Sequence, residues 1–228
     1  AFHLGDFIDR DFKSFAHLKP ITARLRCPLH HALGSHDFDV AEELKDKVPA
    51  ELGLRNTYYA IRQPGFRFLV IDTTEVSTYR HGPDDARTTA AHAELRNLSA
   101  AKRSYAQSWN SRASDAQVTW LSSQLEEADA ARESVLVLGH HPILPEEAHC
   151  TWNRDALHDL FRKHPCCKAY LNGHRHSGGH AVKDGVHYLT MHGMLDTAQN
   201  AFATARLFPS RLEIRGFGRQ PSHTLEFR

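Results

Sequence analysis

The sequence lacks any apolar run of the roughly 18 residues that a membrane-spanning helix requires. Its start also lacks the charged and then apolar pattern of a secretory signal. The sequence has no basic run either. Its 28 lysine and arginine residues are balanced by 27 acidic residues, which leaves a formal charge of +1. These absences predict no membrane association and no nucleic-acid partner, and they favour a small-molecule substrate. The oligomeric state is left open.

Cysteine is scarce, with four residues and no C-x-x-C pair. Cys166 and Cys167 are adjacent, and adjacent cysteines rarely bond to each other. We therefore expect reduced thiols and a cytoplasmic location. The chain has no internal repeat or low-complexity segment, and 41% of its 228 residues are hydrophobic. This composition predicts one globular domain over residues 1–228.

Histidine, by contrast, is abundant, with 18 residues. His174 and His176 are too close in sequence to share one face of a helix, but their spacing suits a loop at the carboxyl end of a strand. A solvent-exposed loop is the alternative interpretation of any single His-x-His pair. Four polar clusters, each after an apolar run, favour a functional site instead: Gly5–Arg10, Gly34–Asp37, Gly139–Pro142 and Gly173–His176.

Apolar periodicity predicts alternating helices and strands in the first part of the chain and antiparallel strands at its end. The predicted helices span residues 11–26, 40–52, 115–132 and 153–163. The predicted strands span residues 27–33, 57–61, 66–71, 134–138, 167–171, 186–190, 202–208 and 211–215. The turn Pro64-Gly65 predicts a hairpin whose outward side chains are Arg62 and Arg67.

Residues 73–114 are polar and weakly helical, and they are longer than an ordinary connection. Such insertions typically form a cap, and we predict one here. The strand–helix alternation around it is typical of an α/β sandwich whose loops gather at the carboxyl ends of the strands. Aspartate and histidine side chains on such loops predict a nitrogen and oxygen site for manganese, iron or zinc. A carboxylate such as Asp6 can bridge two ions roughly 3.5 to 4 Å apart, which would activate water to attack a phosphoryl group.

The four clusters, in the order G-D-x-x-x-R, G-S-H-D, G-H-H-P and G-H-R-H over residues 5–176, resemble the calcineurin-like metallophosphoesterase family. The resemblance implies a four-layer α/β/β/α fold, a metallophosphoesterase-type β-sandwich flanked by helices. It also implies two divalent metal ions, Mn²⁺ above all, with Fe or Zn as alternatives. Carried over by position, it makes Asp6 the bridging carboxylate, His140 and His174 ligands of one ion, and His176 a ligand of the other.

The same resemblance implies roles beside the metal ions. His36 would act on the leaving-group oxygen as an acid or charge stabiliser, and Asp37 would orient it through a hydrogen bond. Arg10 would bind phosphate, although a pair with a neighbouring acid is an equal alternative.

Less specific motifs resemble those of the manganese-dependent ADP-ribose/CDP-alcohol diphosphatases. They lie at residues 150–153, 173–179, 200–204 and 209–219. This implies hydrolysis of a pyrophosphate or phosphodiester bond in nucleotide conjugates, with Phe202 as a stacking surface for the base. For Phe202 the alternative is a core position, since aromatic residues in strands usually pack inward. Phosphomonoesterase or cyclic-nucleotide phosphodiesterase activity would use the same metal residues.

Two departures from the family pattern concern the metal residues. No D-x-H or D-x-Q block precedes Gly5-Asp6, so we expect a missing first strand, at most one tightly held ion and weak activity in the chain as given. Ser35 stands where the family has asparagine, and a hydroxyl is a poorer ligand than a carboxamide oxygen. The rival interpretation is a non-catalytic scaffold with the same fold.

Overall fold

The computed structural model describes all 228 residues, Ala1–Arg228. The helices are α1 (Ser14–Thr22), α2 (Glu42–Lys45), α3 (Val48–Glu51), α4 (Ala86–Ala100), α5 (Asp115–Ala131) and α6 (Arg154–Lys163), with the 3-10 helix η1 (His36–Phe38). The strands are β1 (Phe2–Leu4), β2 (His30–Ala32), β3 (Tyr59–Gln63), β4 (Phe66–Val70), β5 (Ser134–Leu138), β6 (Cys167–Asn172), β7 (Gly179–Lys183), β8 (Val186–Thr190), β9 (Ala201–Phe208), β10 (Arg211–Gly218) and β11 (His223–Glu226). None of the helices combines the length and apolarity needed to cross a membrane.

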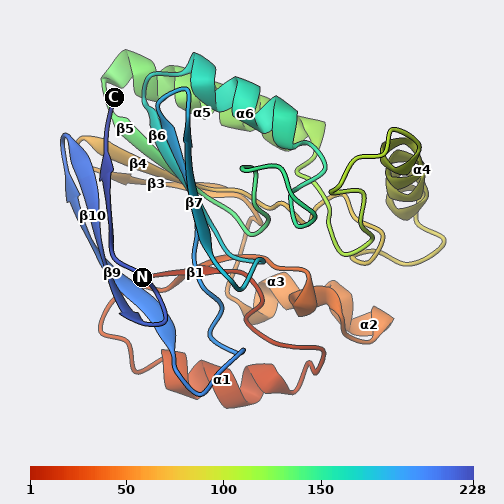
Figure 1. Cartoon of the computed structure of the whole chain (residues 1–228). Helices are drawn as coiled ribbons and strands as arrows, with labels where there is room; N and C mark the ends of the chain where they lie inside the picture. The colour runs from red at the N-terminus through yellow and green to blue at the C-terminus, as the bar shows by residue number, and fades with distance from the viewer.

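A six-stranded sheet in the order β3-β4-β5-β6-β8-β7 forms the centre of the molecule. Its four inner strands run parallel, whereas the edge strands β3 and β7 are antiparallel to their neighbours. One face packs against α5 and α6, which lie above it in Figure 1. Helix α5 begins at Ser114, whose side chain accepts a hydrogen bond from the Gln117 backbone N–H, and it buries Leu121 and Leu125.

The other face of the six-stranded sheet is covered by two smaller sheets. The parallel pair β1-β2 packs on it through Ala32, Val70 and Leu138, and the antiparallel sheet β11-β10-β9 packs on it through Leu212 and Ile214. Helix α1 covers the outside of the β1-β2 pair by burying Phe15 (Figure 1). These four layers confirm the predicted α/β/β/α fold class.

Most elements match the sequence-based prediction, but Arg67 is a correction. The predicted β3-β4 hairpin forms around Pro64-Gly65, yet only Arg62 faces solvent. Arg67 is 2% exposed because α5 covers this face of the sheet. Its guanidinium is paired instead with Glu127 at 2.9 Å and with Glu133 at 2.8 Å.

Three further differences concern the bounds or the presence of elements. The single helix expected at 40–52 is two short helices, α2 and α3, and α3 has Pro49 in its first turn, where proline is tolerated. Helix α1 covers only part of the 11–26 segment and keeps Pro20 inside it. Strands β7 and β11 were not predicted, because each is short and lacks a strong apolar alternation.

Candidate metal centre

The four polar clusters lie on loops that follow β1, β2, β5 and β6. Because β1 and β2 are parallel and in register, the loops that follow them meet at one edge. Gly34 is required there, since a Cβ atom at this position would lie 2.2 Å from the Asp6 backbone nitrogen. Asp6 and His174 both have left-handed backbones, with φ of 56° and 65°. Non-glycine residues in this region are typical of functional sites.

Asp6, His140 and His174 meet at the junction of these loops. His140 Nε2 lies 3.2 Å from Asp6 Oδ2 and 3.1 Å from His174 Nδ1. Ligand atoms around one small cation at ~2.1 Å stand about 3 Å apart. The side chains also come from three separate strand ends, so their convergence is a product of the fold.

The outer nitrogens of both rings contact oxygen atoms. His140 Nδ1 lies 2.7 Å from the Leu4 carbonyl oxygen, and His174 Nε2 lies 3.1 Å from Asn110 Oδ1. Metal-binding histidines typically have such an oxygen on the nitrogen that faces away from the ion. The donor set and its surroundings therefore fit a divalent cation, and carboxylate with imidazole suits Mn²⁺, Fe or Zn.

The pKa values in this cluster are shifted by burial and by the charges of the neighbouring side chains. Burial would raise the pKa of Asp6, but His140 holds that pKa well below its ordinary value. Burial would lower the pKa of His140, but the Asp6 carboxylate raises it above its ordinary value. Burial and the neighbouring histidines lower the pKa of His174 well below its ordinary value, so this ring is neutral, as a metal ligand must be.

His141 also lies in the histidine cluster, within 4.8 Å of His140 and His174 by its nitrogen atoms. Its nitrogens already have partners, since Nδ1 lies 2.8 Å from Thr73 Oγ1 and Nε2 lies 3.4 Å from the Trp109 carbonyl oxygen. Burial lowers its pKa well below the ordinary value. His141 therefore fits a buried supporting role better than that of a ligand.

Ser35, His36 and His176 line one cavity with Asp6 and His174. The volume of this cavity, which we call the metal cavity, is about 390 Å³. His176 Nδ1 lies 3.0 Å from Asp196 Oδ1. The same Asp196 accepts a 2.8 Å hydrogen bond from Arg219, which anchors the loop behind His176.

The hydrogen bond expected from Asp37 to His36 is absent. Asp37 is fully buried and accepts hydrogen bonds from the backbone N–H groups of Ile8 and Gly34, at 3.1 and 2.9 Å. It thereby ties the first two loops together, and burial followed by the charge of Asp6 raises its pKa to about 7. The carboxylate beside His36 is that of Asp9, with Oδ1 2.8 Å from His36 Nδ1.

The two predicted substrate contacts lie outside the metal cavity. Arg10 pairs with Asp9 at 3.3 Å and with Asp39 at 3.2 Å, which corresponds to the alternative interpretation of this residue. Phe202 is 48% exposed, so the core alternative is wrong, and its ring stacks on Phe217 at 4.9 Å between centroids. It does not line the metal cavity.

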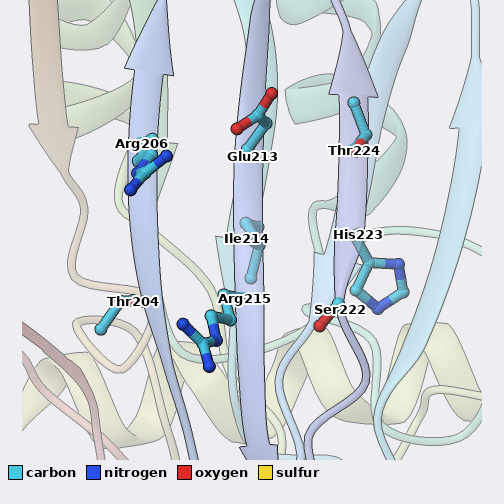
Figure 2. A pocket seen from close by; sticks show the side chains of 8 residues that line it. All are labelled: Thr204, Arg206, Glu213, Ile214, Arg215, Ser222, His223 and Thr224. Carbon is cyan, nitrogen blue, oxygen red and sulfur yellow. The ribbon is translucent and has the colours of Figure 1, made fainter.

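A cavity of about 410 Å³ lies over the three-stranded sheet, away from the metal ligands. Figure 2 shows that its side chains, including Arg206, Glu213 and Arg215, are spread over three neighbouring strands. It has one histidine, His223, and no group of metal-ligand atoms. Its lining offers no catalytic arrangement comparable to the metal cavity.

Sequence reasoning missed three residues of the site. Asn110 and Trp109 belong to the insertion at 73–114, which has no motif that would point to the centre. Asp9 was visible within the first cluster, but its partner His36 follows 27 positions later and only the β1-β2 pairing brings them together.

Comparison with known proteins agrees with this geometry. The chain is 27% identical over 270 residues to the manganese-dependent ADP-ribose/CDP-alcohol diphosphatase of Bos taurus, covering 99% of this chain and 78% of that protein. It is 27% identical over 253 residues to the protein of the same name from Arabidopsis thaliana, covering 98% and 80%. The crystal structure of a dimetal phosphatase from Danio rerio superimposes with a TM-score of 0.86 at 23% identity, over 100% of this chain and 83% of that one.

The family model of the calcineurin-like phosphoesterases matches residues 2–178, the segment that contains all four loops of the metal centre. This match confirms the family predicted from the four clusters. The chain therefore belongs to the calcineurin-like phosphoesterase family and is a metal-dependent phosphohydrolase.

Proposed function

We propose that this protein hydrolyses the pyrophosphate bond of nucleotide conjugates such as ADP-ribose and CDP-alcohols, and that it uses two Mn²⁺ ions. The observation that carries the proposal is the convergence of Asp6, His140 and His174. Asp6 and His174 line the metal cavity together with His36. The names of the relatives, which match this chain over nearly its whole length, support the substrate class.

Asp6, His140 and His174 would hold one ion, and Ser35 lines the metal cavity beside Asp6 and His174. Asp6 and His176 would hold the second ion, and Asp196 fixes the His176 ring from behind. When bound, the ions would neutralise charge on the phosphoryl group and activate the attacking water. Arg10, at the edge beyond His36, would attract the negatively charged substrate.

His36 would give a proton to the oxygen of the leaving group. Asp9 accepts the Nδ1–H of His36 and so fixes the ring, which leaves Nε2 for the substrate. Asp37 would hold the loops of Asp6 and His36 at constant separation through its two backbone hydrogen bonds. Phe202, exposed beyond the cavity, would contact only a substrate that extends past it.

The test is turnover of ADP-ribose and CDP-choline by the full-length protein with Mn²⁺, with and without a chelator. We expect the chelator to abolish hydrolysis. His36→Ala should slow an alkyl ester of a nucleotide, whose alkoxide is a poor leaving group, by about 10² to 10⁴. It should slow a p-nitrophenyl ester of a nucleotide much less, because that leaving group needs no proton.

His92→Ala is the matched control, since His92 is exposed on α4 and should leave both rates unchanged. Hydrolysis that survives the chelator would refute the metal-dependent mechanism. Equal slowing of both substrates by His36→Ala would refute the role of His36.

A further inference from the structure

A second cavity adjoins the metal cavity at His36. Its volume is about 380 Å³, and it shares Ser35, His36 and Trp109 with the metal cavity. Its other lining residues, among them Arg10 and Lys45, do not line the metal cavity. His36 therefore stands at the junction, and a substrate cleaved there would have one part in each cavity. We call the second one the outer cavity.

Trp109 is the wall that both cavities share. Its side chain is 48% exposed, whereas Trp152 is 3% exposed and Trp120 is half-buried against Tyr58. An indole is a large apolar surface, and leaving it open to water beside a cavity costs free energy that a flat ligand would recover. Trp109 is thus a candidate stacking surface.

The backbone of Trp109 is held in place. The next residue, Asn110, is fully buried, and its side chain donates hydrogen bonds to the carbonyl oxygens of Tyr105 and Ala148 at 3.0 and 2.6 Å. The Trp109 carbonyl oxygen itself lies 3.4 Å from His141 Nε2. The main chain that carries the exposed ring is therefore fixed. This lowers the entropy that binding would otherwise cost.

The outer cavity also contains a lysine side chain that is not paired with a carboxylate of the protein. Arg10 is shared between Asp9 and Asp39, but Lys45 forms no ion pair. Lysine offers three N–H donors and suits phosphate as a point charge. An aromatic surface together with a free cation is the chemistry that recognises a nucleoside monophosphate.

We propose that the outer cavity binds the nucleoside monophosphate part of the substrate, with its base stacked on Trp109 and its phosphate near Lys45. This inference rests on the proposed function. In the reaction, a P–O bond forms between water and the phosphorus in the metal cavity, and the bridging P–O bond breaks. The electron pair stays on the oxygen of the leaving nucleoside monophosphate, which takes a proton from His36. The attacking water loses a proton to the solvent, and His36 takes up a proton from the solvent.

The experiment compares two substrates, ADP-ribose and an aliphatic diester of pyrophosphate that has no base, in the Mn²⁺-loaded full-length protein. Trp109→Ala should raise KM for ADP-ribose by about 5- to 150-fold, the range for loss of one base stack, with little change in kcat. KM for the aliphatic substrate should not change. Trp109→Tyr should restore KM for ADP-ribose, because it keeps an aromatic surface. Trp120→Phe is the matched control and should behave as the wild type.

Binding of AMP, followed by tryptophan fluorescence, tests the cavity without turnover. AMP should quench the wild-type protein, and this quenching should be lost in Trp109→Phe but kept in Trp120→Phe. Quenching that persists in Trp109→Phe, or a KM that Trp109→Ala raises equally for both substrates, would overturn the inference. If the wild type hydrolyses neither substrate, the proposed function is wrong, and the AMP titration still decides the fate of the outer cavity.

Discussion

Asn110 determines which nitrogen of His174 is available to a cation. Both amide hydrogens of Asn110 are used by the carbonyl oxygens of Tyr105 and Ala148, so its oxygen is the atom that faces His174. An oxygen acceptor requires N–H on Nε2 of His174, which leaves the lone pair on Nδ1, beside His140. One amide orientation thereby selects one histidine tautomer.

We predict that Asn110→Leu lowers the affinity for Mn²⁺ by about 10- to 100-fold, because the oxygen that orients His174 is lost. Asn110→Asp keeps an acceptor and should retain most of the affinity. Calorimetric titration with Mn²⁺ measures both effects, and ¹⁵N NMR of the metal-free protein should find His174 protonated on Nε2. Asn97→Leu, on the exposed side of α4, is the control. Wild-type affinity in Asn110→Leu would contradict the prediction.

At the scale of elements, β1 and β2 each contribute a neutral histidine, which is half-buried at His3 and buried at His31. His3 and His31 are directly paired in the ladder, and the Nδ1 atoms of both are buried without a hydrogen-bond partner. Burial, followed by the charge of neighbouring histidines, lowers the pKa of each ring from 6.5 to about 4. The unfolded chain therefore binds protons between pH 6.5 and 4 that these two folded rings do not bind.

This difference makes both histidines destabilising as the pH falls through that window. Each would remove up to about 3 kcal/mol between pH 6.5 and 4. We predict that His3→Phe loses less stability than the wild type over this range, as measured by urea unfolding at several pH values. His17→Phe, at an exposed position of α1, should follow the wild type. Parallel pH profiles for His3→Phe and wild type would show that His3 does not contribute.

The elements themselves were predictable where the signal is local. Strand β5 has the predicted bounds because its residues form one apolar run, and α5 begins at the predicted residue, Asp115. Arg67 was misjudged because its partners Glu127 and Glu133 lie about sixty positions further along the chain. The contact of Asn110 with His174 likewise depends on the fold of the insertion, which periodicity does not reveal. The family's metal residues were recognisable because their motifs are contiguous.

At the scale of the whole molecule, the metal centre joins two sheets. Asp6 follows β1 of the two-stranded sheet, whereas His140 and His174 follow β5 and β6 of the six-stranded sheet. Figure 1 shows these sheets as separate layers of the sandwich. A cation bound by all three side chains would therefore hold the layers together, and it would bind the folded state alone.

We predict that Mn²⁺ at 100-fold above its Kd stabilises the protein by about 2.7 kcal/mol. For a chain of this size, the increase in Tm is about 5 to 10 °C. Calorimetry with Mn²⁺ and with a chelator measures the shift, which His140→Ala should lose and His92→Ala should keep. An identical Tm in Mn²⁺ and in chelator would rule out a metal bridge between the sheets.

Trp109, Asn110 and Ser111 follow one another in the chain, yet they contact three different parts of the site. Trp109 lines both cavities, Asn110 contacts His174, and Ser111 Oγ lies 3.5 Å from His141 Nε2. Displacement of this tripeptide would change the cavities and the metal ligands together, which makes the two binding equilibria interdependent. By reciprocity, if bound metal raises the affinity for the nucleotide by some factor, bound nucleotide raises the affinity for the metal by the same factor. A favourable coupling would therefore mean that bound substrate helps to retain the ions that cleave it.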